Sequence, residues 1–238
     1  MLPSHSIDLA PLRVGPFTLT TFRVMKDPWS FATHFAGLLA ACCGAVALVA
    51  MSRHDPLLAL SMTIYATAVV GVFTASSLYH FFDVGPRGNA WLRRLDHAAI
   101  FAMIAGSYVP PLMCLLDGPW RAGMLAAVLT FGVLGTVFKV AWITCPRWLG
   151  TTIYLAMGWI VVIPAGRIFA QLDASQIALL AAGGASYSLG SIVYVKQWPD
   201  PWPGRFGHHE VWHLFVLAGA ALHFAFVATL LDHPIAPF

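Results

Sequence analysis

The chain has 238 residues, of which 59% are hydrophobic and only 10% are charged. Globular proteins average roughly 45–50% apolar and about 25% charged residues, so this composition excludes a soluble domain that covers itself with polar side chains. The net charge of +3 comes from basic residues spread over several loops, which excludes a concentrated nucleic-acid-binding patch. The sequence therefore predicts a polytopic membrane protein.

Apolar runs long enough to cross a bilayer follow one another along most of the chain. A span needs about 20 apolar residues, and a run without strand-like alternation can satisfy its backbone in lipid only as a helix. We expect an all-α fold, with a seven-helix transmembrane domain over 31–238. The seven expected spans are Phe31–Ser52, Pro56–Phe82, Asp96–Leu116, Arg121–Trp142, Gly150–Ala170, Ala174–Gln197 and His209–Leu231.

Residues 1–30 are expected to form a cytoplasmic N-terminal tail. They carry scattered prolines and charges and lack the apolar core and cleavage site of a signal peptide. With seven spans, ten of the thirteen lysines and arginines fall on the side of the N-terminus and three on the other side. Because cytoplasmic loops carry the excess of basic residues, we expect the N-terminus inside and the C-terminus outside.

The four cysteines form no C-x-x-C pair and no disulfide framework. Two of them are adjacent within the first span, one lies near the outer end of the third, and one lies in a loop on the inner side. We expect all four to be packing residues. They are Cys42, Cys43, Cys114 and Cys145.

Ionisable residues within the spans indicate where function lies, because lipid disfavours them unless they pair or bind a ligand. Ser76 and His80 are four residues apart in the second span, as are His209 and His213 in the seventh. Residues at this spacing share one helix face, ~6 Å apart along the axis. Asp96 begins the third span. Since successive spans alternate in direction, all five residues are expected at the cytoplasmic depth.

Three imidazoles from two helices form a candidate tri-histidine metal site with an open position. Nitrogen ligands in a tetrahedral set, without a sulfur ligand, favour Zn2+. We assign His80, His209 and His213 as ligands. His208 points about 100° away from its neighbour His209. His223, ~15 Å further along the helix than His213, is interpreted as a separate polar contact.

Other interpretations of these residues stay open. His34 either packs or donates a hydrogen bond to the site, and His97 is expected at a helix interface. Asp96 either caps the third helix or orders a water at the metal. The segment His209–His213 also matches H-E-x-x-H, in which Glu210 would be the base of a metalloprotease. Haem ligation is a further possibility for paired histidines.

Several longer segments together resemble the bacterial hemolysin III family, which is grouped with the progestin and adipoQ receptors and the alkaline ceramidases. The similarity extends from His34 to His223. It rests on Ser76–His80 (SSLYH), Leu95–Phe101 (LDHAAIF), Ala105–Pro110 (AGSYVP) and His208–Gly219 (HHEVWHLFVLAG).

The resemblance implies that His80, His209 and His213 bind zinc on the cytoplasmic side of a seven-helix bundle. It places Asp96 and Ser76 against a water on that zinc. Ceramidase relatives hydrolyse a lipid amide, adipoQ receptors respond to a hormone, and hemolysin III proteins are named for lysis of red cells. The short tail argues against hormone binding and, with the resemblance, favours a bacterial cell membrane.

We therefore expect a zinc-dependent hydrolase that acts on a lipid amide or ester. Asp96 would accept the proton of the attacking water, and Ser76 would stabilise the developing oxyanion. The alternatives are a receptor-like or membrane-perturbing protein with a structural zinc, and an intramembrane metalloprotease. The expected partner is membrane lipid and not nucleic acid, while the substrate and the oligomeric state stay open.

Overall fold

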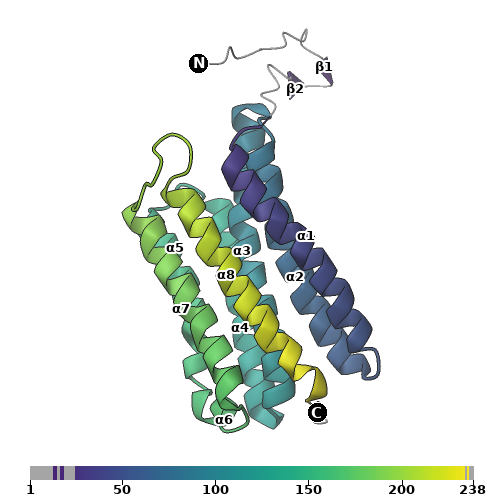
Figure 1. Ribbon diagram of the computed structural model, residues 1–238. Helices are drawn as coiled ribbons and strands as arrows, with labels where there is room; N and C mark the ends of the chain where they lie inside the picture. Colours follow the sequence, from purple (N-terminus) through teal and green to yellow (C-terminus); the bar gives the residue numbers. More distant parts are fainter. Residues whose placement is uncertain (1–12, 15–16, 19–24, 234, 236–238) are drawn as a thin grey trace.

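Long helices lying side by side form the body of the protein (Figure 1). The computed structural model describes residues 13–14, 17–18, 25–233 and 235. Within these residues six helical segments are long and apolar enough to cross a membrane. The chain is therefore a polytopic helical membrane protein. The six segments are α1 (Pro28–Met51), α2 (Pro56–Phe81), α3 (Gly85–Leu115), α4 (Gly118–Ala141), α7 (Ala174–Lys196) and α8 (His208–Ala228), which continues into the 3-10 helix η2 (Thr229–Asp232).

Local sequence signals explain where these helices begin. α1 to α4 each carry proline at the first or second helical position, where its missing N–H leaves no hydrogen bond unmade. Asp55 caps α2 by accepting hydrogen bonds from the backbone N–H groups of Leu57 and Leu58, at 2.8 and 3.1 Å. Asp173 and Gln176 form a reciprocal capping box at the start of α7.

The expected third span begins much earlier than its apolar run. α3 starts at Gly85, so Asp96 lies inside the helix and cannot cap it. The added turns contain Arg87, Arg93 and Arg94, which is why the boundary of the apolar run missed them. The alternative role of Asp96 as a helix cap is wrong.

The segment expected as one helix over Gly150–Ala170 is divided into shorter pieces. Pro164 cannot donate the backbone hydrogen bond that would continue the helix. In addition, the hydroxyl of Tyr108 donates to the carbonyl of Gly158 (2.5 Å) and accepts from the N–H of Val161 (3.1 Å). A side chain inserted into the hydrogen-bond ladder interrupts a helix. The pieces are α5 (Arg147–Gly158), the 3-10 helix η1 (Trp159–Val162) and α6 (Ala165–Phe169).

Close helix packing determines how the bundle is assembled. α2 packs between α1 and α3, and α7 packs along α8. At the α7–α8 contact a Cβ at Gly190 would lie 2.6 Å from Phe215 Cβ, and one at Gly219 would lie 2.8 Å from Tyr187 Cζ. Small residues thus allow the two helices to approach, as in other membrane bundles. α1 and α8 begin at the same end of the molecule, where α2 ends (Figure 1).

Most of the expected tail over 1–30 lies outside the described residues. Within it, β1 (Arg13–Val14) pairs antiparallel with β2 (Phe17–Thr18), a small departure from an entirely helical chain. α1 begins at Pro28, three residues before the expected start of the first span at Phe31. The start of this helix therefore belongs to the helical domain, and residues there contact the histidines of the site.

Candidate metal centre

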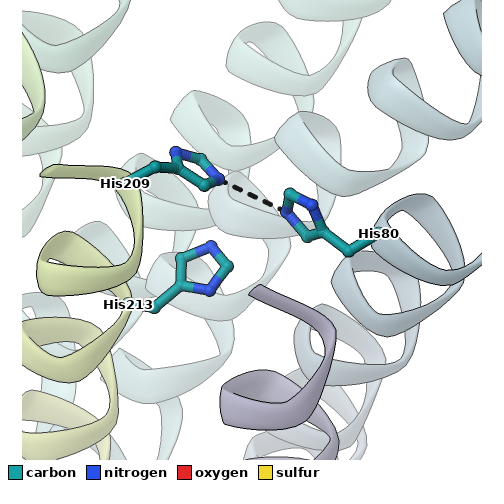
Figure 2. A group of neighbouring side chains, drawn as sticks. All are labelled: His80, His209 and His213. Atoms are coloured by element: carbon teal, nitrogen blue, oxygen red, sulfur yellow. Dashed lines mark hydrogen bonds between the residues drawn. The ribbon is translucent and has the colours of Figure 1, made fainter. Parts of the chain in front are cut away.

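Three histidines converge at the end of the bundle where α1 and α8 begin (Figure 2). His80 lies in the last turn of α2, whereas His209 and His213 lie one turn apart at the start of α8. One ring nitrogen of each lies within 4.8 Å of the others. The Nε2 atoms of His80 and His209 are 3.3 Å apart. The structure thus brings together the three histidines that were predicted as metal ligands, as a group that could hold one ion.

Asp27 orients the first of these imidazoles. Its Oδ2 accepts a hydrogen bond from His80 Nδ1 at 3.0 Å, and its backbone N–H donates to the carbonyl of His80 at 2.9 Å. Because an ionised carboxylate can only accept, Nδ1 carries the proton and Nε2 presents its lone pair. Asp27 occupies the N-cap of α1, yet its side chain makes no capping bond. Its carboxylate instead fixes the ring of His80, as carboxylates behind metal-binding histidines do.

The electrostatics of Asp27 fit this role. Burial opposes the charged form, but the hydrogen bond from His80 and the positive charge of Lys26 outweigh it and lower the pKa of Asp27. Lys26 Nζ lies 3.8 Å from the same carboxylate. The group is therefore held as a carboxylate beside the histidines.

Thr33 orients His213 in the same way. The Thr33 hydroxyl donates to the carbonyl of Ser30 at 2.9 Å and lies 3.1 Å from His213 Nδ1. Since its one proton is used, it accepts from Nδ1–H, and the lone pair of His213 lies on Nε2. That Nε2 atom is buried and has no hydrogen-bond partner among the described residues. A buried nitrogen without a partner is unfavourable, so the donor set fits a metal ion.

Ser76 lies behind the histidines and contacts a fourth imidazole. Its hydroxyl is 2.6 Å from His34 Nδ1. The ring of His34 stacks on that of His213, with 3.5 Å between ring centroids and 11° between the planes. His34 is thus a hydrogen-bond partner of Ser76 as well as a packing residue of the site.

Asp96 is buried close to the histidines but is not one of the metal-ligand group. Its Oδ2 lies 3.5 Å from Nδ1 of the adjacent His97, an ion-pair distance without hydrogen-bond geometry. It interacts electrostatically with His80 and His209. The carboxylate therefore stands beside the candidate metal position and does not occupy it.

A cavity of about 410 Å³ extends from Asp96 and His34 into the bundle. This volume falls in the usual range of small-molecule sites. Its walls come mainly from α3, α5, α6, α7 and α8, and they are largely apolar. Representative wall residues are Ile100, Met103, Leu112, Val216 and Phe226.

Glu210, the second residue of the H-E-x-x-H motif, is fully engaged elsewhere. One carboxylate oxygen accepts from the hydroxyl of Ser30 at 2.5 Å, and the other accepts from the N–H of Gly207 at 2.8 Å. These bonds close the start of α8 and join it to α1. This geometry favours the tri-histidine interpretation over a metalloprotease.

His208 and His223 make their polar contacts outside the triad, and the four cysteines are not among its candidate ligands. His208 is 3.4 Å from the amide nitrogen of Gln197, and His223 is 3.4 Å from the carbonyl of Leu180. His223 is thus in a separate polar contact, as expected. All four cysteines are free, with Cys114 and Cys145 buried.

Two residues of the site escaped sequence analysis. Asp27 and Thr33 precede or begin the first apolar run and lie far along the chain from the histidines they contact. The pair Asp27–Pro28 is a signal for a helix start, which would have extended α1 to include this turn. It would not have revealed that the carboxylate turns towards His80.

Comparisons with known proteins agree with this picture. Residues 22–224 match the family model described as "Haemolysin-III related". The chain is 31% identical over 180 residues to "Hemolysin-3" of Bacillus cereus, covering 75% of this chain and 79% of the relative. It is 30% identical over 205 residues to "Hemolysin-3 homolog" of Bacillus subtilis (strain 168), covering 85% and 93%. It is also 35% identical over 165 residues to "Heptahelical transmembrane protein ADIPOR2" of Oryza sativa subsp. japonica, covering 61% and 70%.

Proposed function

The chain belongs to the haemolysin-III-related family, within the progestin and adipoQ receptor superfamily, and from this premise we propose that it is a membrane-embedded zinc hydrolase. The reaction is cleavage of an amide or ester bond in a lipid. The observation that carries this proposal is the pair of oriented imidazoles beside a buried carboxylate and an apolar cavity. A purely structural histidine cluster would not need that cavity.

The donor set supports zinc as the metal. His80, His209 and His213 supply three nitrogens and no sulfur, which suits a catalytic zinc site with an open position. When bound, zinc polarises a carbonyl and activates water near neutral pH. Asp27 and Thr33 hold the rings in the tautomers that leave Nε2 available.

The residues beside the triad supply the remaining chemistry. Asp96 accepts the proton of the attacking water and returns it to the leaving group. If Nδ1–H of His34 donates to Ser76, the hydroxyl proton of Ser76 is free to stabilise the oxyanion of the substrate. The acyl chain lies in the cavity, which keeps bulk water away from the reacting carbonyl.

The proposed topology has seven crossings, with the N-terminus in the cytoplasm and the C-terminus outside. Six crossings are the long helices, and the fifth in chain order is made by α5, η1 and α6 together. α5 lies towards one end of the bundle and α6 at the other (Figure 1). The name "Heptahelical" of the rice relative supports this count. The excess of basic residues on the inner side supports the orientation, and the bacterial relatives support the cytoplasmic membrane.

A second candidate function is non-enzymatic. The ligands come from α2 and α8, so a metal would join the first helical hairpin to the last helix and stabilise their packing. The names of the Bacillus relatives favour a membrane-perturbing role for such a protein. Dye leakage from liposomes containing the purified protein measures that activity directly.

The hydrolase proposal is tested at Asp96. Purified protein is incubated with a ceramide and with a phospholipid in mixed micelles, and released fatty acid is measured by mass spectrometry. Asp96→Asn should lower turnover at least about 100-fold, the lower range for loss of a general base. Its zinc content should stay at the wild-type value, because Asp96 is outside the ligand group.

His97→Gln is the matched control, since it alters the neighbour of Asp96 and keeps the carboxylate. It should retain most of the turnover. Unchanged turnover in Asp96→Asn would remove the assignment of this residue. Absence of turnover on both lipids in zinc-loaded wild type would favour the structural-metal alternative.

A further inference from the structure

Three basic side chains line the same cavity as Asp96, at its end near the metal centre. Arg93 comes from α3, Lys139 from the end of α4, and Arg147 from the start of α5. We propose that these three residues bind the anionic headgroup of an amphiphile, a carboxylate or a phosphate monoester, whose chain occupies the cavity. This inference rests on the proposed function, because it names the substrate class of that site.

The burial of Lys139 is the strongest support for this site. Its side chain is buried, with 5% of the residue exposed, and its Nζ donates a hydrogen bond to Cys145 Sγ at 3.2 Å. A Cβ at Gly150 would lie 3.3 Å from Nζ, so the glycine leaves room for the ammonium group. Within the described residues Lys139 forms no ion pair with a carboxylate. A buried ammonium whose partner is a thiol is unfavourable until an anion reaches it.

The two arginines extend this positive surface from other helices. The guanidinium of Arg147 lies 5.9 Å from the ring centroid of Tyr194, and Arg93 also interacts electrostatically with that tyrosine. Neither arginine forms an ion pair among the described residues. Guanidinium groups bind carboxylate and phosphate through two parallel hydrogen bonds. The three cations thus supply the donors that an oxyacid headgroup needs.

The balance of charge around the cavity points the same way. Asp96 is the single acidic residue among its lining residues, and its ion-pair partner is His97. Three lining cations therefore face a single carboxylate. The positive-inside rule accounts for basic residues in contact with water or lipid headgroups, but not for a lysine buried inside the protein.

The walls beyond this end select a chain rather than a free ion. Ile104, Leu112 and Phe226 belong to the apolar lining deeper in the bundle. Apolar walls with a few convergent polar groups are typical of ligand sites in which the polar groups fix orientation. An amphiphile satisfies both halves of the cavity, whereas inorganic phosphate satisfies only one.

The test measures binding and does not depend on turnover. Dodecyl phosphate, laurate, dodecanol and inorganic phosphate are titrated into purified full-length protein in maltoside micelles by calorimetry, with empty micelles as the blank. Dodecyl phosphate and laurate should each bind at least about tenfold more tightly than dodecanol, which corresponds to one unit of log Kd. Inorganic phosphate should bind at least about tenfold more weakly than dodecyl phosphate.

Variants separate the headgroup site from general positive charge. Lys139→Met should lower the affinity for dodecyl phosphate at least about tenfold and leave that for dodecanol unchanged, since methionine keeps the length of the side chain without its charge. Lys196→Met removes an exposed cation that does not line the cavity, so it should bind as wild type. Arg147→Gln, at an exposed position, should weaken binding even if the Lys139 variant fails to fold.

The same titration on His80→Ala distinguishes failure of this proposal from failure of the proposed function. Suppose that His80→Ala still binds dodecyl phosphate more tightly than dodecanol, and that wild type hydrolyses no lipid. This pair of results would support the headgroup site and reject only the hydrolase. Equal affinities for the two ligands would overturn the headgroup site. So would wild-type affinity in both Lys139→Met and Arg147→Gln, or binding of inorganic phosphate as tight as that of dodecyl phosphate.

Discussion

The two ends of the bundle differ in whether their polar side chains have hydrogen-bond partners. At the end where α7 begins, Asp173 accepts from the N–H of Gln176 at 2.9 Å, and the Gln176 side chain donates to Thr229 at 3.0 Å. Hydrogen bonds from the Ser175 hydroxyl and the Gln176 N–H lower the pKa of Asp173. At the other end, Nε2 of both His34 and His213 is buried without a partner among the described residues. Polar side chains at the first end hydrogen-bond one another, whereas the second end holds buried nitrogens that a bound ligand could satisfy.

Removing a member of the triad should have the largest effect. His80→Ala or His213→Ala takes away one of three candidate ligands and leaves too few to hold a metal tightly. Elemental mass spectrometry of protein purified without chelators should find about one zinc per chain in wild type and almost none in either variant. His223→Ala, further along α8, should keep the metal. Wild type without metal would reject the zinc site.

Substitution of the groups behind the ligands should have the next largest effect. Asp27→Asn should weaken metal binding by about 10–100-fold, because the carboxylate no longer fixes the ring of His80 in one tautomer. Competition with a chromophoric chelator measures this affinity. Asp173→Asn, at the far end of the bundle, is the matched control and should bind as wild type. Equal affinities would mean that Asp27 is only a surface partner of Lys26.

Glu210→Gln distinguishes the two metal motifs. The variant should keep its zinc and lose no more than about twofold in lipid turnover, because both carboxylate oxygens serve the start of α8. The loss of one hydrogen bond to a charged group should lower the free energy of unfolding by about 1–3 kcal/mol. A turnover loss of about 100-fold with the metal retained is the result expected of a general base, and it would restore the H-E-x-x-H interpretation.

The smallest effect is expected at the end of the bundle opposite the metal centre, where α2 begins. Asp55→Ala removes the cap of α2, so the free energy of unfolding should fall by about 1 kcal/mol. Zinc content and turnover should be unchanged. Thermal melting in detergent, read alongside metal analysis, checks both statements. Loss of zinc in this variant would show that the start of α2 and the metal centre are coupled, which contradicts the independence of the two ends.

Much of the fold follows from local sequence. Apolar runs predicted α1, α2, α4, α7 and α8 within a few residues, because lipid forces each run to satisfy its own backbone. The same argument misplaced the start of α3, whose first turns are polar. It also missed the division of the fifth segment, since Tyr108, which interrupts the hydrogen-bond ladder, is 53 residues before Val161.

The candidate site was also predicted only in part from the sequence. The i, i+4 spacing of His209 and His213, with alternating span directions, was enough to predict that His80 would face them. The positions of Asp96 and Ser76 as catalytic groups stay predictions. In the structure the Ser76 hydroxyl lies at hydrogen-bond distance from His34, and Asp96 lies on a cavity wall beside the triad.

By itself the sequence determined that this is a helical membrane protein and which histidines share a helix face, because both depend on periodicity along a single segment. Only the tertiary structure decided which nitrogens are free to bind. That depends on Asp27 and Thr33 of one helix meeting His80 and His213 of two others. Likewise, the burial of Lys139 beside an apolar cavity results from the packing of separate helices, which no local pattern encodes.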